Sequence, residues 1–227
     1  TVTISGWLVV GNPADLDPND SPDIRAWTGG RLWAPGGIVV DEDIDAQGGC
    51  VVVSLRFSDC AGWNDDPFPS SSNDTRGVKM GGSLRAINGG SVVFDQTFAY
   101  VEERVELTNP TRVVLVAPYG VQASTDCDPS ESFFAAPTAG CFEDLALWSV
   151  GSGVSTHTLL GNSFTHLDGT IYVHDLADRL RIQGSLTDPI TAQLVASRIT
   201  VENGELTLIG DGDRSTLVPR SGGSLIR

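Results

Sequence analysis

Hydrophobic and polar residues alternate over short segments of the C-terminal third, and two of these segments repeat. LADRLRIQG at 176–184 and VASRITVENG at 195–204 align without gaps over their first eight residues, at an offset of 19 residues. Both copies keep the alternation of a strand with one buried face. A repeat of about 20 residues built on short strands is typical of a solenoid, in which each turn buries its inward side chains on the next. The inward positions are predicted to be Leu180, Ile182, Ile199 and Val201.

Similar strand-like segments occur along the rest of the chain with less regular spacing. They lie at 3–12, 29–49, 50–57, 81–96, 111–120, 169–173 and 205–209. Double glycines begin at 29, 36, 48, 81 and 89, as expected of tight corners between short strands. The pattern predicts an all-β chain that forms a right-handed parallel β-solenoid (β-helix). An ordinary β-sandwich is the alternative fold.

Length and composition favour one elongated domain over residues 1–227. Hydrophobic residues make up 40% of the chain, which is enough for a continuous core, and 26 Gly with 12 Pro indicate many corners. Three longer polar stretches, near 12–23, 60–77 and 120–141, are predicted to be loops that project from the coil. Loops on a rigid scaffold are where binding residues concentrate.

The net charge argues against nucleic acid as a partner, and the length of the apolar runs argues against a membrane span. The formal net charge of −15 would repel a phosphate backbone, so nucleic acid is not expected as a partner. The apolar runs, such as VVLVA at 113–117, are far too short for a membrane span. Strand-like alternation is already present at TVTISGWLVV, which favours an upstream segment that has been removed.

The four cysteines fall into two local pairs, Cys50 with Cys60 and Cys127 with Cys141. Neither pair has the C-x-x-C spacing of a zinc site, and no histidine is close in sequence, so two disulfides are predicted. A disulfide that closes such a short loop contributes about 3 kcal/mol to stability. Disulfides persist in oxidising compartments, so we expect an exported protein with an extracellular or cell-surface location.

Residues 145–208 resemble a bacterial surface pattern. A corner, a strand and a second strand follow one another here: Leu160-Gly161-Asn162, then Gly169 to Val173, then Ile190 to Leu206. This order and spacing resembles the C-terminal domain of pilus-assembly TadE/TadG-like exported surface proteins. The resemblance implies a β-solenoid in a bacterial envelope context and carries over no catalytic residue. The chain departs from the pattern at His174 and in its acidic N-terminal half.

The N-terminal acidic stretch offers alternating oxygen ligands like the start of a calcium loop. The candidate ligands are Asp15, Asp17, Asn19, Ser21 and Asp23. The sixth and twelfth positions of such a loop require Gly and Glu, but Asp20 and Ala26 stand there. A turn-rich loop is therefore favoured, and calcium is the one cofactor that the pattern allows. Two further acidic groups, Asp41 to Asp45 and Asp211 with Asp213, are interpreted as solvated faces.

Two further groups could carry metal or catalytic chemistry. His157, His166 and His174 share one region and could form a metal or acid/base pair, although ordinary exposed or capped histidines are favoured, because a metal site needs three or four ligands. A glycosidase or lyase on a β-helix needs two or three acidic side chains on one strand face, together with an Arg or Lys. The residues that come nearest to this set are Asp175, Asp178 and Arg179. A charge pair at a strand corner is the favoured interpretation, so no catalytic residue is predicted.

Exposed aromatic side chains stack on sugar rings and anchor interfaces. Trp63 and Phe68 lie in a polar, Pro-rich loop and form a candidate contact patch. The other tryptophans, Trp7, Trp27, Trp33 and Trp148, stand among apolar strand residues and are expected in the core or a cap.

The favoured function is a non-catalytic structural or adhesive module of a bacterial cell surface or pilus-like appendage, with loops presented for binding. Its expected partners are other surface or pilus subunits, or a glycan. The alternatives are a carbohydrate-active enzyme on a β-helix and a subunit of a filament or virion. The last of these would assemble as a homo-oligomer or filament, because uncapped solenoid ends present strand edges.

Overall fold

The computed structural model describes residues 2–3, 7–10, 23–64, 76–118, 144–151, 156–160, 164–173, 179–184 and 190–208. Within these ranges the chain forms strands and no helix. A helix long and apolar enough to cross a membrane is accordingly not found in this part of the chain.

The strands fall into three rows, which the chain visits in turn. The first row is β1 (Val2–Thr3), β4 (Arg31–Trp33), β7 (Cys50–Val53), β10 (Ser91–Phe94) and β13 (Arg112–Val116). The second is β2 (Trp7–Val10), β5 (Gly37–Val40), β8 (Arg76–Met80), β11 (Thr97–Val101), β14 (Leu145–Ser149) and β18 (Thr191–Val195). The third is β3 (Ile24–Trp27), β6 (Ile44–Gln47), β9 (Leu84–Ile87), β12 (Val105–Thr108), β15 (Thr156–Leu160), β17 (Arg179–Gln183) and β19 (Arg198–Glu202). The long strand β16 (Phe164–Val173) pairs with both β13 and β14 and so joins the first two rows.

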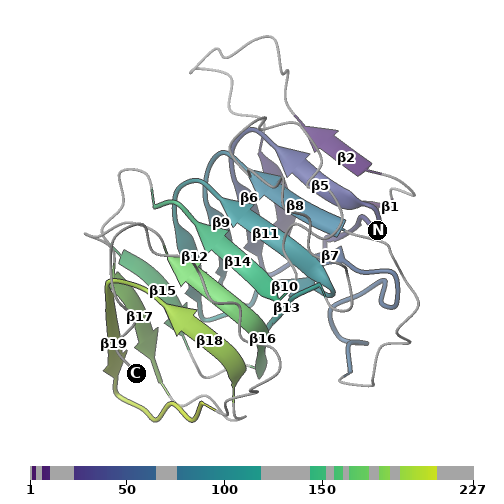
Figure 1. Cartoon of the computed structure of the whole chain (residues 1–227). Helices are drawn as coiled ribbons and strands as arrows, with labels where there is room; N and C mark the ends of the chain where they lie inside the picture. Colours follow the sequence, from purple (N-terminus) through teal and green to yellow (C-terminus); the bar gives the residue numbers. More distant parts are fainter. Residues whose placement is uncertain are drawn as a thin grey trace.

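Each pass through the three rows makes one turn, and successive turns lie side by side along the molecule (Figure 1). The ladders between described strands are parallel, as in β5 with β8, β10 with β13 and β15 with β17. The prediction of an all-β chain of parallel strands is confirmed. The antiparallel pairing of a β-sandwich does not describe these ladders.

The residues that align in the 19-residue repeat are also the residues that pair between the two strands. Strand β17 pairs with β19 so that Leu180 lies beside Ile199 and Ile182 beside Val201. Leu180 and Ile182 are 1% and 0% exposed, as predicted. Ile199 and Val201 take the predicted inward face in this register, but each is 42% exposed. Strand β19 ends the third row, so no further described strand covers them.

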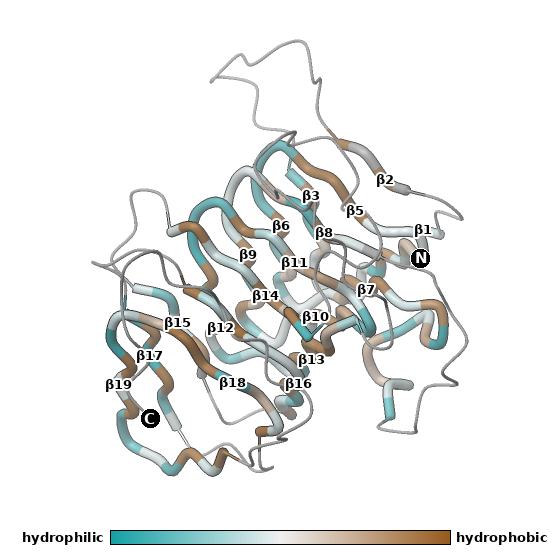
Figure 2. The backbone as a smooth tube through the Cα atoms, viewed as in Figure 1, coloured by the Kyte–Doolittle hydropathy of each residue, from teal (hydrophilic) through white to brown (hydrophobic). Residues whose placement is uncertain are grey.

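The core runs along the inside of the turns, where alternate residues of all three rows meet. Figure 2 shows the matching hydrophobic segments along β5, β10 and β13. The first row is buried on both faces: Val51 and Val53 of β7 face the core, while Val52 packs in a second cluster outside it. Burial on both faces explains the continuous apolar runs CVVV and SVVF, which do not alternate with polar residues.

Candidate functional site

Residues 54–64, here called the clasp loop, cover the outer face of the first row. Cys60 and Trp63 of this loop are 6% and 5% exposed. They pack against a row of outward-facing valines from three neighbouring strands, Val52, Val93, Val114 and Val116. The loop thus buries apolar surface that a single-layered coil would leave in water. Of the predicted loop near 60–77, residues 60–64 are anchored to the sheet by Cys60 and Trp63, residues 76–77 begin the strand β8, and residues 65–75 lie outside the described ranges.

A buried ion pair fixes the start of the clasp loop. The Asp95 side chain is fully buried, and Arg56 donates to it from Nη2 to Oδ1 at 2.7 Å and from Nε to Oδ2 at 3.1 Å. Ser54 Oγ donates to Oδ2 at 2.9 Å, and Trp63 Nε1 lies 3.4 Å from Oδ1. Several donors compensate the cost of removing this carboxylate from water.

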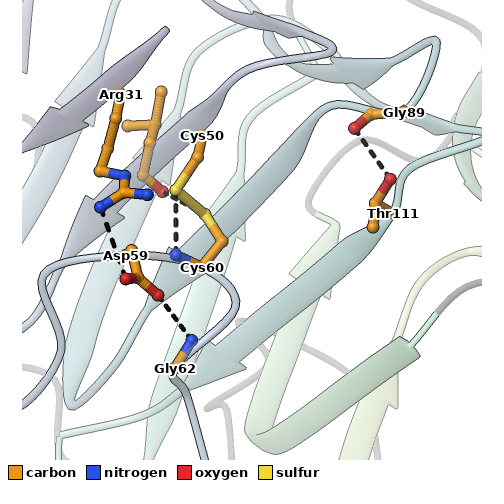
Figure 3. The surroundings of a disulfide bond; sticks show 8 residues. Arg31, Cys50, Asp59, Cys60, Gly62, Gly89 and Thr111 are labelled. Carbon is orange, nitrogen blue, oxygen red and sulfur yellow. Dashed lines mark hydrogen bonds and ion pairs between the residues drawn. A yellow bond between two sulfur atoms is a disulfide. The ribbon is translucent and has the colours of Figure 1, made fainter. Parts of the chain in front are cut away.

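The disulfide Cys50–Cys60 closes the clasp loop onto β7, with the two Cα atoms 6.0 Å apart (Figure 3). This confirms the predicted pairing of these two cysteines; Cys127 and Cys141 lie outside the described residues. The same region holds an ion pair at 3.4 Å between Arg31 Nη1 and Asp59 Oδ2. The other oxygen of Asp59 accepts a hydrogen bond from the Gly62 backbone N–H at 2.6 Å.

Stacked glycine pairs form the corners beside the disulfide, where the third row leads into the first. The pairs are Gly29-Gly30, Gly48-Gly49 and Gly89-Gly90. A Cβ at Gly90 would lie 1.8 Å from the carbonyl oxygen of Ala46, and one at Gly49 would lie 2.4 Å from that of Ala26. Only glycine permits this close approach of one turn to the next.

A cavity of about 290 Å³ lies against these corners and is here called the corner groove. Glycine backbone, the disulfide and the polar side chains of Arg31, Asp59, Ser91, Thr111 and Arg112 line it. Figure 3 shows Arg31 and Asp59 on one side of the disulfide and Thr111 on the other. Arg112 Nη1 donates to the carbonyl oxygen of Trp63 at 2.9 Å, and its guanidinium lies 4.3 Å from the centre of the Phe164 ring. Both contacts hold this cation in a fixed orientation.

The groove has two cationic side chains and one anionic side chain, in a chain whose net charge is −15. Guanidinium groups bind carboxylates through paired hydrogen bonds. The hydroxyls of Ser91 and Thr111 can hydrogen-bond to neutral polar groups, although Thr111 Oγ1 already donates to the Gly89 carbonyl at 2.9 Å. The arrangement can therefore bind a polar ligand that carries negative charge.

The structure changes the interpretation of the predicted aromatic patch. Trp63 is buried, and its ring centre lies 4.6 Å from that of His166 and 5.6 Å from that of Phe164. It consolidates the clasp loop and is not an exposed contact residue, so its predicted role is wrong. Phe68 lies outside the described residues. Trp27, expected in the core or a cap, is 62% exposed on the third row.

Of the calcium candidates, only Asp23 lies within the described ranges, because Asp15, Asp17, Asn19 and Ser21 fall outside them. The Asp23 carboxylate pairs with Arg25 and accepts a hydrogen bond from the Asp43 backbone N–H at 3.3 Å. Three or more side chains placed to hold a metal are not found together in the described part of the chain. Asp211 and Asp213 also lie outside it.

The acidic group at 41–45 lies at the corner between β5 and β6. Asp43 Oδ1 accepts the Ser83 backbone N–H at 2.6 Å and so ties one turn to the next. Burial, followed by the neighbouring carboxylate of Asp43, raises the pKa of Glu42. Burial also raises the pKa of Glu102, and it lowers the pKa of Lys79 in β8 to about 8. At this corner one turn is hydrogen-bonded to the next, and the charged side chains are partly removed from water.

The histidines do not converge. His157 is fully buried on the inward side of β15, and its Nδ1 accepts the Val105 backbone N–H at 3.2 Å. His166 lies on the outer side of β16 against Trp63. The sheet therefore separates the two imidazoles, and His174 lies outside the described residues. Asp175 and Asp178 also lie outside them, while Arg179 begins β17 beside Arg198.

Sequence reasoning missed the Asp95 network, although a signal for it exists. SVVF at 91–94 and CVVV at 50–53 are matching apolar segments, and each is followed by a polar residue, Asp95 or Ser54. Because the two strands pair in register, with Phe94 beside Val53, these polar residues meet at the same corner. Comparing the residues that follow equivalent strands would have found the pair.

Comparison of the chain with protein-family models, with curated proteins and with solved structures gives no match. The resemblance to pilus-assembly surface proteins therefore stays a prediction.

Proposed function

We propose that this chain is a non-catalytic, extracellular module of a bacterial cell surface or pilus-like appendage, built as a right-handed parallel β-solenoid. The observation that carries the proposal is the stacking of parallel strands in three rows, with β17 and β19 in the register of the 19-residue repeat. Right-handedness is proposed because about 98% of connections between parallel strands of one sheet take that hand.

The Cys50–Cys60 disulfide supports an extracellular location. A reducing cytosol would open such a bond, whereas secreted and surface proteins keep it. In this proposal the disulfide and the Asp95 network hold the clasp loop against the sheet. The corner groove beside the loop therefore keeps its shape in an extracellular environment.

The corner groove supports a glycan as the ligand, and specifically a glycan with carboxylate groups. Arg31 and Arg112 offer guanidinium groups for a uronate carboxylate. Gly29, which also lines the groove, has open space where a Cβ would stand, so a sugar ring can approach the backbone there. A neutral glycan would gain only hydrogen bonds from the two guanidinium groups and no charge–charge attraction, so the charge of the glycan should separate good ligands from poor ones.

Calorimetric titration with oligogalacturonate, and with a neutral dextran oligosaccharide of similar length, tests this proposal. We expect binding of the acidic oligosaccharide only, and about a tenfold loss of affinity in Arg31→Gln, which corresponds to about 1.4 kcal/mol. Arg104→Gln is the matched control, because Arg104 is exposed at another corner and pairs with Glu106. Equal binding of both oligosaccharides, or an equal loss in both variants, would reject the groove as the site. Cleavage of either oligosaccharide would reject the non-catalytic role.

A further inference from the structure

The last turn exposes an apolar interior. Ile199 and Val201 continue the inward positions of Leu180 and Ile182, yet both are 42% exposed, and Leu208 nearby is 48% exposed. Strand β19 is also the last strand of the third row, so one of its edges has no partner among the described strands. An open edge beside exposed apolar side chains is a surface on which another strand can pair.

The opposite end of the third row is closed. Ile24 and Ala26 of β3 hold the corresponding inward positions at the start of the row, as shown by their pairing with Ile44 and Ala46. They are only 7% and 5% exposed. A second copy stacked head to tail would therefore find its apolar target already covered. The two ends do not match each other, which argues against a filament grown by end-to-end stacking.

The sequence of β19 is complementary to itself when reversed. It reads Arg198-Ile199-Thr200-Val201-Glu202. In an antiparallel pair centred on Thr200, Arg198 of one copy faces Glu202 of the other, and Ile199 faces Val201. Residues directly opposite each other point to the same face, so the charged pairs share the outer face and the apolar pairs share the inner one.

The charges on β19 are available for such pairing. Arg181 donates to Glu202 from Nε at 3.0 Å and from Nη2 at 2.7 Å, and both bonds end on Oε2. The Oε1 atom remains for Arg198 of the second copy. Arg198 itself makes no ion pair within the described part of the chain and is exposed.

We propose that two copies of this chain form a two-fold dimer by antiparallel pairing of their β19 strands about Thr200. Such an interface uses the same surface on both copies, so it closes after two and does not propagate. It would extend the third row from one copy into the other and would cover Ile199 and Val201 of both. This inference goes beyond the proposed function, because it names a second copy of the chain as the partner.

Sedimentation velocity of the full chain over a range of concentrations tests the dimer. We expect a reversible monomer–dimer equilibrium and a monomer only for Thr200→Lys, which places two like charges together on the two-fold axis. Thr108→Lys is the matched control, because Thr108 lies on the same row with strands on both sides; it should dimerise like the parent chain. A full chain that remains monomeric at high micromolar concentration, or forms polymers larger than dimers, would overturn the proposal.

A charge swap tests the register. Arg198→Glu and Glu202→Arg should each weaken dimerisation by about tenfold or more, because each places like charges opposite one another. The double variant Arg198→Glu/Glu202→Arg should recover the dimer. Arg181→Gln controls for loss of the ion pair within one copy and should leave dimerisation nearly unchanged. A double variant no better than the single ones would reject pairing about Thr200.

Discussion

The clasped middle turns and the last turn contain the same kinds of interaction in very different surroundings. Arg56 with Asp95, and Arg181 with Glu202, are ion pairs with nearly identical bond lengths. The Asp95 side chain is fully buried, whereas the Glu202 side chain is 35% exposed. The inward residues of the third row differ in the same way, from 1% exposure at Leu107 of β12 to 42% at Val201 of β19. Position in the stack, and not the local sequence, sets the burial of each unit.

This difference is expected of a repeat architecture. Each turn contacts only its neighbours, so its stability is the sum of its own contribution and its interfaces with the turns on either side. Turns with two neighbours, reinforced by the clasp loop, should resist perturbation locally, while the last turn depends on whatever binds its free edge.

The largest expected effect is loss of the buried carboxylate. Asp95→Ala leaves Arg56 and Ser54 without their acceptor and should cost about 3–4 kcal/mol. Glu202→Ala removes a partly exposed pair whose two bonds end on one oxygen, and it should cost less than about 1 kcal/mol. Urea unfolding of both variants measures the two free energies. Equal costs would show that burial does not separate the two regions.

The next largest effect is the loss of stability when inward side chains are truncated. Ile182→Ala should cost about 3 kcal/mol, because it leaves a cavity in a fully packed position. Val201→Ala, in the paired position of β19, should cost about 1 kcal/mol or less when measured on the monomer at low concentration. Thermal unfolding checks both. A comparable loss for Val201→Ala would mean that the last turn is covered after all.

Removal of the disulfide should have an effect of about 2–3 kcal/mol, given the sequence separation of 10 between Cys50 and Cys60. The double variant Cys50→Ser/Cys60→Ser should also become sensitive to proteases within the clasp loop, while sites in the third row stay protected. Limited proteolysis followed by mass spectrometry distinguishes the two regions. Cleavage in both regions at once would indicate that the clasp loop supports the whole stack.

A further expected effect is a change of stability with pH that originates at Lys79. Burial lowers the pKa of Lys79 to about 8 in the folded chain, from 10.5. Between these two values the unfolded chain binds a proton that the folded chain has released, so stability should rise as the pH increases from 8 to 10.5. Lys79→Met should remove this component, seen as the difference between the two stability curves. A difference that does not change with pH would contradict the burial of the ammonium group.

The sequence was most informative where the hydrophobic pattern is regular. The offset between 179–183 and 198–202 predicted the pairing of β17 with β19 residue for residue. It could not predict that Ile199 and Val201 are exposed, because periodicity reports which face a side chain takes and not whether another turn follows. The burial of the outer face of the first row could not be predicted either. The residues that follow CVVV are polar and do not indicate a loop that packs over this face.

The site was less predictable than the fold. Cysteine spacing predicted Cys50–Cys60, but Trp63 was interpreted from its polar neighbours as exposed and is buried against His166. Its surroundings come from β10, β13 and β16, which lie far away in the sequence. The corner groove likewise depends on glycine pairs from separate turns, and only the stacking brings them together.

The stacking of the turns is tested most directly by a distance between two spin labels. Gln47 of β6 and Gln183 of β17 lie at equivalent positions of the third row, with β9, β12 and β15 between their strands. Four spacings of about 4.8 Å predict a backbone separation of about 19 Å between these residues. Pulsed electron resonance on Gln47→Cys/Gln183→Cys, made in a background in which Cys50, Cys60, Cys127 and Cys141 are all changed to Ser, should give one narrow distribution near this value. A broad distribution, or a distance well beyond about 30 Å, would contradict the stacked rows.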